Sequence, residues 1–282
     1  MKLQWSKFCL DFSKKTHIMG VLNVTPDSFS DGGIYFNVDA AVEHGLRMVE
    51  DGADIIDVGG ESTRPGSEPV EEDEEIRRTI PVIESLAKKV DVPISIDTYK
   101  SEVAKRALDA GASIVNDISG LRFDPEMPKV AAEYNVPVVI MHIKGTPRDM
   151  QKNPVYEALI PEIMDYLRIS IRFAMKFGVR EDMIIIDPGI GFGKTVEHNL
   201  HVLKNLHEFT LLGKPVAIGV SRKSFIGRIL DNAPPLERLE GTAAAVAVSI
   251  MNGANIVRVH DVKEMVKVAR VADAIKRGSV YS

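Results

Sequence analysis

The stretch VPISIDTYKSEVAKRALDAGASIVNDIS, residues 92–119, places two short apolar runs on either side of a segment with helical spacing. The runs are rich in Ile and Val and do not alternate with polar residues, which indicates burial on both faces, as in a parallel sheet covered by helices. A glycine just before a strand allows a left-handed helix cap, so we expect the helix to end at Gly111. The stretch therefore predicts a strand, a helix and a second, parallel strand.

The same unit recurs along the chain. Apolar runs that end in a polar residue occupy eight segments: residues 16–24, 54–60, 92–98, 112–119, 136–142, 183–189, 214–221 and 254–260. Helical spacing is clearest over residues 39–53, 71–90, 100–112 and 239–254. Eight such units in about 260 residues predict a closed (β/α)8 TIM barrel, with a doubly wound open sheet as the alternative. Residues 3–12 are expected to form an N-terminal hairpin at the barrel bottom. No Pro/Gly/Ser-rich linker divides the chain, which predicts a single domain over residues 1–282.

Composition narrows the function classes. The chain has 282 residues, 45% hydrophobic and 27% charged, with a formal net charge of −5. This acidic balance argues against a nucleic-acid or anionic-membrane partner, since both need a surplus of Lys and Arg on one face. The first 17 residues lack the apolar core of a signal peptide, so we expect a cytoplasmic location. A single cysteine, Cys9, excludes intramolecular disulfides and thiolate metal clusters.

Polar residues gather at the carboxyl ends of the predicted strands, where barrels of this type carry their active sites. Each of the eight runs ends at or near one of them: Asn23, Asp57, Asp97, Asn116, His142, Asp187, Ser221 and His260. One polar residue at a strand end is usually a turn former. Eight converging on one rim predict a functional site.

Asp97, Asn116 and Asp187 suggest a ligand with several N–H donors and a carbonyl, such as the edge of a 2-amino-4-oxo-pteridine or of guanine. Two alternatives stay open for the carboxylates. They could form a general acid/base pair, or they could be helix-capping and turn residues.

Basic residues follow the last two predicted strands. The segment GVSRKSFIGRIL, residues 219–230, is expected to start a helix near Ser224 and to bind an anion there, with Lys223 a stronger candidate for ligand contact than Arg222. Arg258 and His260 fall on the same face of their strand, which favours a diphosphate site over a satisfied core histidine.

Two loops also carry candidate chemistry. Residues 59–69, GGESTRPGSEP, have the composition of a mobile loop. Its Arg64 would stabilise the charge on a leaving group, and the alternative is a solvated arginine with no such role. Residues 187–195, DPGIGFGKT, resemble a glycine-rich phosphate cradle, but glycine spacing alone is a weak signal.

Taken together, these segments resemble a known family, the dihydropteroate synthases of folate biosynthesis. The matching segments run in order over almost the whole chain: GVLNVTPDSFSDGG, DIIDVGGESTRPG, PISIDTYK, IVNDISG, MHIKGTPRDMQ, IIIDPGIGFGKT, GVSRKSFIG and GANIVRVHDV. The resemblance implies a TIM barrel that joins 6-hydroxymethyl-7,8-dihydropterin diphosphate to 4-aminobenzoate and releases diphosphate. It also implies a homodimer and a sulfonamide target.

The resemblance further implies roles for individual residues. Pterin contacts are implied for Asp97, Asn116, Asp187 and Lys223, with Arg258 stacked on the ring, and Met141 is a further implied substrate-binding residue. Diphosphate contacts are implied for Asn23, Thr63, Arg258 and His260, with Mg²⁺ bound at Asn23. Aminobenzoate contacts are implied for Thr63, Pro65, Phe192 and Ser224, and Phe29 on the first loop would cover this substrate. Arg64, Asp97, Lys223 and His260 are the expected catalytic residues.

Two other functions are compatible with a pterin-binding barrel. One is a methyltransferase that passes a methyl group from a pterin to a corrinoid protein, which would not need the loop ESTRPGS. The other is a catalytically idle pterin-binding module. Loss of Arg64, Lys223 or Asn23 would be expected in an idle module, yet all three are present.

Overall fold

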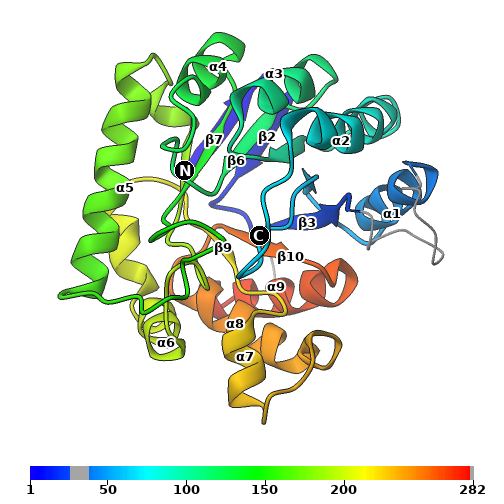
Figure 1. The fold of residues 1–282 in the computed structure, drawn as a ribbon. Coiled ribbons are helices and arrows are strands. Elements are labelled where there is room, and N and C mark those ends of the chain that lie inside the picture. The colour runs from blue at the N-terminus through cyan, green and yellow to red at the C-terminus, as the bar shows by residue number, and fades with distance from the viewer. Residues whose placement is uncertain (26–37, 280–282) are drawn as a thin grey trace.

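The computed structural model describes residues 1–25 and 38–279. Eight parallel strands form one sheet in the order β8-β7-β6-β5-β4-β3-β10-β9 (Figure 1). The strands are β3 His17–Asn23, β4 Ile55–Gly59, β5 Ile94–Asp97, β6 Ile114–Asp117, β7 Val138–Met141, β8 Ile184–Asp187, β9 Ala217–Gly219 and β10 Ile256–Val259. The two outer strands meet, because Ile186 bridges to Val216 and its N–H donates to the Pro215 carbonyl at 2.9 Å. The predicted (β/α)8 barrel is confirmed.

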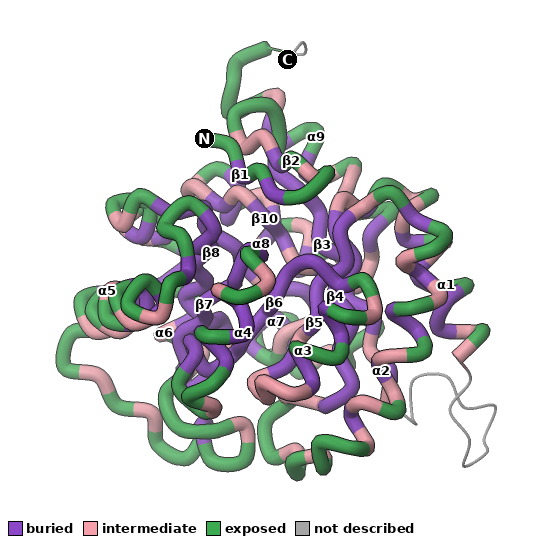
Figure 2. The backbone as a smooth tube through the Cα atoms, turned by 90° about the horizontal axis from the view of Figure 1, so that it is seen from above, coloured by how far each residue is buried: buried purple, intermediate pink, exposed green. Residues whose placement is uncertain are grey.

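Helices surround the strands on the outside of this barrel (Figure 1). They are α1 Val38–Glu50, α2 Glu72–Ala87, α3 Ser101–Asp109, α4 Met127–Tyr134, α5 Leu159–Lys176, α6 Val196–Lys204, α7 Ser224–Ile229, α8 Leu239–Met251 and α9 Val262–Arg277. Short 3-10 turns precede β8, β9 and α8. Helix α3 illustrates why they dock, since Val103, Ala104, Ala107 and Leu108 form one buried stripe. Figure 2 shows this pattern throughout, with buried strands inside and exposed residues on the outer helix faces.

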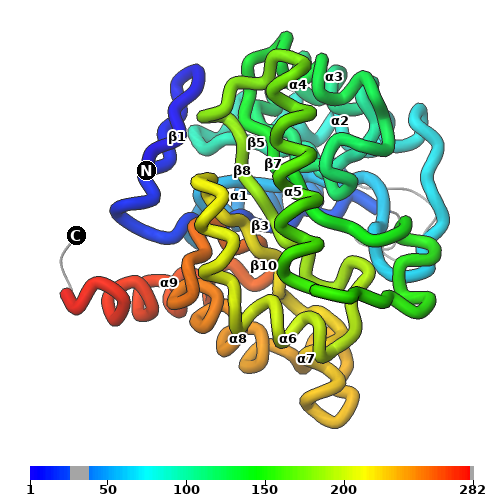
Figure 3. The backbone as a smooth tube through the Cα atoms, turned by 90° about the vertical axis from the view of Figure 1, so that its left-hand side faces the viewer, coloured from blue at the N-terminus to red at the C-terminus, as the bar shows by residue number. Residues whose placement is uncertain are grey.

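The N-terminal hairpin lies where the sequence placed it. Strands β1 Lys2–Trp5 and β2 Phe8–Asp11 pair antiparallel and stand apart from the barrel strands (Figure 3). Leu3, Trp5 and Leu10 are buried in one cluster with residues from the amino-terminal halves of the barrel strands, including Met19 and Ile256. The hairpin therefore closes the bottom of the barrel, opposite the strand carboxyl ends.

That residues 1–282 form a single domain stays a prediction. In the ranges that the structure describes, none of the helices has the length and apolar character needed to cross a membrane.

Candidate active site

Strand register places the predicted site residues at one level around the barrel mouth. Asn23 lies beside Gly59, Gly59 beside Asp97, and Asp97 beside Asn116. On the other side, Met141 lies beside Asp187. Because neighbouring strands are parallel and in step, side chains at their carboxyl ends converge on the same opening.

Arg258 is the central cation of this mouth. Its Nε donates to Asp57 Oδ2 at 2.5 Å, and its Nη2 donates to Asp97 Oδ2 at 2.7 Å. Asn116 Nδ2 donates to the same Asp57 oxygen at 3.1 Å. Burial lowers the pKa of the Arg258 guanidinium, but the two carboxylates outweigh burial and raise this pKa above its usual range. The sequence predicted a diphosphate beside Arg258, and in the structure its partners are the protein's own carboxylates, Asp57 and Asp97.

Asp57 is a residue whose role sequence reasoning missed. It was placed on the rim without a function, yet its side chain is 0% exposed and holds both Arg258 and Asn116. The pairing joins strands 201 positions apart in sequence, so spacing along the chain gives no direct signal. The one available signal was an ionisable residue within a continuous apolar strand.

Two carboxylates have strongly perturbed acidity. Burial raises the pKa of Asp97 to about 7, with Arg258 acting against this effect and Asp57 adding to it. Burial also raises the pKa of Asp187 to about 6, although the Gly189 N–H and Lys223 act in the opposite direction. Oδ1 of Asp97 and Oδ1 of Asp57 are buried and have no hydrogen-bond partner among the described residues. The Asp97 side chain is 9% exposed and that of Asp57 is 0% exposed, so Asp97 Oδ1 is the better acceptor for a ligand that brings N–H donors.

Lys223 and Phe192 form a second side of the mouth. Lys223 Nζ lies 4.2 Å from the centroid of the Phe192 ring, a cation–π contact. Burial, together with the nearby Arg258 charge, lowers the pKa of Lys223 to about 8. Phe192 packs with Met141, Ile118 and neighbouring apolar residues in one buried cluster. The mouth therefore joins an apolar wall to hydrogen-bonding groups, which suits a flat heteroaromatic ring.

The glycine-rich segment 187–195 does not form the phosphate cradle that its sequence resembles. Two of its glycine N–H groups bond within the protein, with Gly189 donating to Asp187 Oδ1 and Gly191 donating to Asn199 Oδ1, both at 2.7 Å. Gly189 has a φ of 72°, and a Cβ at this position would lie 1.9 Å from the His142 carbonyl oxygen. Gly189 therefore allows this loop to pack closely against the backbone of His142, directly after β7.

Lys194 is a second residue whose structural role sequence reasoning missed. It is 2% exposed, and its Nζ contacts His142 Nδ1 at 2.8 Å, the Gly189 carbonyl at 2.9 Å and the Phe192 carbonyl at 3.0 Å. These contacts fix the loop that carries Phe192. His142, expected on the rim, is instead buried behind this loop, and burial lowers its pKa well below the usual value.

His260 follows β10 and faces the β9 loop. Ser221 Oγ accepts from the His260 N–H at 3.2 Å and lies 3.0 Å from His260 Nδ1. If this hydroxyl donates to Nδ1, the ring proton lies on Nε2. Burial lowers the pKa of His260 to about 3, and the positive charges of Arg258, Arg222 and Arg64 act in the same direction. The ring is therefore neutral in the free protein.

Arg222 pairs with Asp261, in keeping with its weaker candidacy for ligand contact.

The remaining predicted residues lie around this centre with differing exposure. Asn23 and Thr63 are half-buried, whereas Arg64, Pro65 and Ser224 are exposed. Ser224 begins α7, and Lys223 is its N-cap residue with extended backbone. Phe29 lies outside the described residues.

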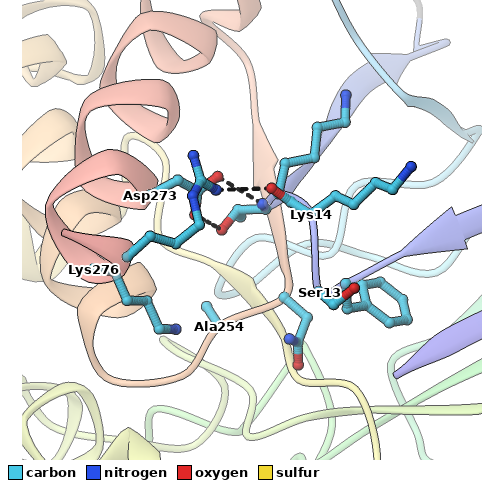
Figure 4. A pocket seen from close by; sticks show the side chains of 10 residues that line it. Ser13, Lys14, Ala254, Asp273 and Lys276 are labelled. Carbon is cyan, nitrogen blue, oxygen red and sulfur yellow. Dashed lines mark hydrogen bonds between the residues drawn. The ribbon is translucent and has the colours of Figure 1, made fainter. Parts of the chain in front are cut away.

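The described residues contain no group of three or more His, Cys, Asp or Glu side chains able to hold a metal ion. A cavity of about 120 Å³ lies at the opposite end of the barrel, between α9 and residues 12–16, which connect the hairpin to β3 (Figure 4). There both carboxylate oxygens of Asp273 are bound by Thr16, and Arg277 donates to the Lys14 carbonyl. This cavity is separate from the strand carboxyl ends.

Comparison with known proteins agrees with this geometry. The sequence profile of the family described as pterin binding enzyme matches residues 19–260. The dihydropteroate synthase of Bacillus subtilis (strain 168) is 53% identical over 273 residues, covering 96% of this chain and 93% of the relative. The chain belongs to the dihydropteroate synthase family.

Other dihydropteroate synthases extend the likeness. That of Escherichia coli (strain K12) is 46% identical over 274 residues, covering 97% of this chain and 96% of the relative. The Yersinia pestis enzyme, solved in a sulfonamide drug complex, superposes with a TM-score of 0.93 at 42% identity, over 98% of this chain and 100% of that one. The Xanthomonas albilineans enzyme, solved with 7,8-dihydropteroate, gives 0.88 at 39% identity, over 98% and 99%. The function expected from the sequence, that of a dihydropteroate synthase and so of a transferase, is confirmed.

Proposed function

We propose that the described mouth joins 6-hydroxymethyl-7,8-dihydropterin diphosphate to 4-aminobenzoate, giving 7,8-dihydropteroate and diphosphate. The observation that carries this assignment is the buried, unpartnered Oδ1 of Asp97 beside Asn116, Asp187 and Lys223. A pterin edge presents N–H donors and a carbonyl, which match carboxylate acceptors and amide or ammonium donors. Arg258 would stack on the ring, while Met141 and Phe192 would form its apolar wall.

Diphosphate would lie where cations and N–H donors surround the mouth. Arg258, His260 and Thr63 are the proposed contacts, and the exposed Arg64 would approach from its loop. A neutral His260 with its ring proton on Nε2 can donate one hydrogen bond to a diphosphate oxygen. Diphosphate departs with the electron pair of the C–O bond that it breaks. The amine nitrogen of aminobenzoate then attacks the same carbon, forms the C–N bond and releases a proton.

Asp97 and Asp187 would support this order of events. The cation left by diphosphate is delocalised into the pterin ring, and fixed negative charge beside the ring stabilises it. No covalent intermediate with the protein is required. Aminobenzoate would lie against Thr63, Pro65 and Phe192, with its carboxylate near Ser224.

Mg²⁺ fits this site through Asn23. The ion favours oxygen ligands and is usually bound by few protein groups together with substrate phosphates. The Asn23 side chain supplies an amide oxygen, half-buried at the end of β3. When bound there, Mg²⁺ would neutralise charge on the departing diphosphate.

Homodimerisation and sulfonamide binding are also part of the proposal. Val248 and Met251 on α8, with Val271 and Ile275 on the adjacent α9, are exposed apolar side chains that a second copy would cover. A sulfonamide would occupy the aminobenzoate position. A cytoplasmic location stays a prediction. Light scattering tests the dimer, for which a monomer at micromolar concentration is the contrary result.

The test of the reaction is a synthesis assay with single omissions. Purified protein is incubated with the pterin diphosphate, aminobenzoate and Mg²⁺, and dihydropteroate and diphosphate are both quantified. We expect equal amounts of the two products, and no dihydropteroate when the pterin diphosphate, aminobenzoate or Mg²⁺ is left out. Pterin binding without any dihydropteroate would instead support the idle-module alternative.

A further inference from the structure

One ammonium group holds both ends of the loop that carries Thr63 and Arg64. Lys100 Nζ donates to Glu61 Oε2 at 2.5 Å, where the loop leaves β4, and to the Val70 carbonyl at 2.7 Å, where it enters α2. It also pairs with Glu75, on the first turns of α2. Lys100 itself follows β5, three residues after Asp97.

The two ends of the loop are also joined to each other. Glu61 Oε2 accepts from the Val70 N–H at 3.1 Å, so residues 61–70 form a closed loop whose base is a side-chain hydrogen-bond network. Its tip is attached less firmly. Gly66 N–H donates to the Pro147 carbonyl at 3.0 Å, and a salt bridge between exposed side chains links Glu68 with Arg148. The base therefore determines where the loop points.

Tyr99 connects the base of the loop to the apolar cluster at the barrel mouth. Tyr99 OH donates to Glu61 Oε1 at 2.7 Å, and its ring packs against the buried cluster that contains Met141 and Phe192. Tyr99 therefore joins the loop base to this cluster, which includes the proposed aminobenzoate contact Phe192.

Burial makes the contacts at the base strong and mutually dependent. Glu61 is 9% exposed and Glu75 is 1% exposed, so each carboxylate needs a cation nearby. Burial raises the pKa of Glu75 against the effect of Lys100. Although burial lowers the pKa of Lys100, the two carboxylates raise it above its usual value, so the amine is protonated. Without this cation the two carboxylates would repel each other, and the loop base would open.

We propose that Lys100 is a positioning residue for the aminobenzoate half of the site, because it fixes the loop 61–70 that carries Thr63 and Pro65, two of the proposed aminobenzoate contacts. This inference rests on the proposed function. Lys100 has no role in holding the pterin, whose contacts come from Asp97 and the strands beyond it.

The test compares two variants that each remove a buried lysine. Lys100→Met removes the cation at the loop base. Lys214→Met is the matched control, because Lys214 is 8% exposed and bonds the Glu181 carbonyl at 3.0 Å at the foot of β9, away from the mouth. Steady-state kinetics give KM for aminobenzoate, and fluorescence titration with 6-hydroxymethylpterin gives pterin affinity.

For Lys100→Met we expect KM for aminobenzoate to rise about 10- to 100-fold, because a small misplacement of a binding group is enough for such a loss. Pterin affinity is expected to stay within about twofold, as for a site whose contacts are unchanged. Lys214→Met is expected to leave both quantities near wild type. Lys100→Arg should recover most of the aminobenzoate affinity, since it restores the charge.

A second variant, Glu61→Gln, replaces Lys100→Met if the latter does not fold. The Gln amide can still form hydrogen bonds at the loop base, but the negative charge that pairs with Lys100 is lost. This variant should raise KM for aminobenzoate selectively. The inference would be overturned if Lys100→Met or Glu61→Gln changed aminobenzoate KM and pterin affinity equally. It would also be overturned if neither variant changed either quantity. Failure of the wild-type protein to form dihydropteroate would instead overturn the proposed function.

Discussion

Arg258 and Asp97 meet across the barrel mouth, with Nη2 of the arginine 2.7 Å from Oδ2 of the carboxylate, although 161 positions separate them in sequence. The pair leaves the second Asp97 oxygen without a partner among the described residues. A charged, oriented acceptor is thus held at the place proposed for the pterin.

Asp97→Asn is expected to lower kcat/KM for the pterin diphosphate by about 100-fold or more, since an oriented charge is lost where positive charge develops. The variant should remain folded, because Arg258 keeps its contact with Asp57. Steady-state kinetics and circular dichroism check both statements. Asp91→Asn, at a fully exposed position, is the control. Near-normal turnover would remove Asp97 from the mechanism.

The pH dependence of kcat/KM should show two limbs. Asp97 and Asp187 have pKa values raised to about 7 and about 6, so their acceptor form is lost as pH falls through this range. Lys223 has its pKa lowered to about 8, so its charge is lost as pH rises above that value. Activity should therefore fall below pH 7 and again above pH 8. A profile that is flat from about pH 5.5 to 9 would contradict these assignments.

Lys194→Met should lower the free energy of unfolding by about 2–4 kcal/mol, because the variant leaves buried acceptors of His142, Gly189 and Phe192 without a donor. Urea denaturation measures this change. Lys105→Met, at an exposed position on α3, should change the free energy of unfolding by less than about 0.5 kcal/mol. Similar values for the two variants would mean that Lys194 does not anchor the loop.

Gly189→Ala and Gly213→Ala separate steric clash from backbone strain. The two glycines have similar φ values, 72° and 67°, but a Cβ at Gly189 meets the His142 carbonyl, while one at Gly213 meets nothing within 4 Å. Gly213→Ala should lose about 1–2 kcal/mol for the left-handed backbone alone. Gly189→Ala should lose several kcal/mol more, or fail to fold. Thermal unfolding compares them, and equal losses would exclude the clash.

The sequence could predict the barrel because its strands are buried on both faces and so appear as uninterrupted Ile/Val runs. It could also predict that Asp97, Asn116 and Asp187 converge, since parallel strands bring their carboxyl ends to one rim. These inferences need only the order of elements along the chain.

The contacts of Asp57, Lys194 and Lys100 could not be predicted in the same way. Each depends on which side chain fills a given space between elements that lie far apart in sequence. His142 illustrates the point, because its strand-end position predicted the rim, while packing against Lys194 turned it inward. Asp57 and Arg258 similarly form a pair that periodicity along the chain does not encode.

A crystal structure of this chain with 7,8-dihydropteroate tests the central claim most directly. We expect pterin N–H groups at about 3 Å from Asp97 Oδ1 and from the Asp187 carboxylate, with Lys223 at the ring edge. Arg258 should lie over the ring, and the benzoyl carboxylate should lie near Ser224. A pterin ring bound away from Asp97 and Asp187 would contradict the account, even if the protein formed the product.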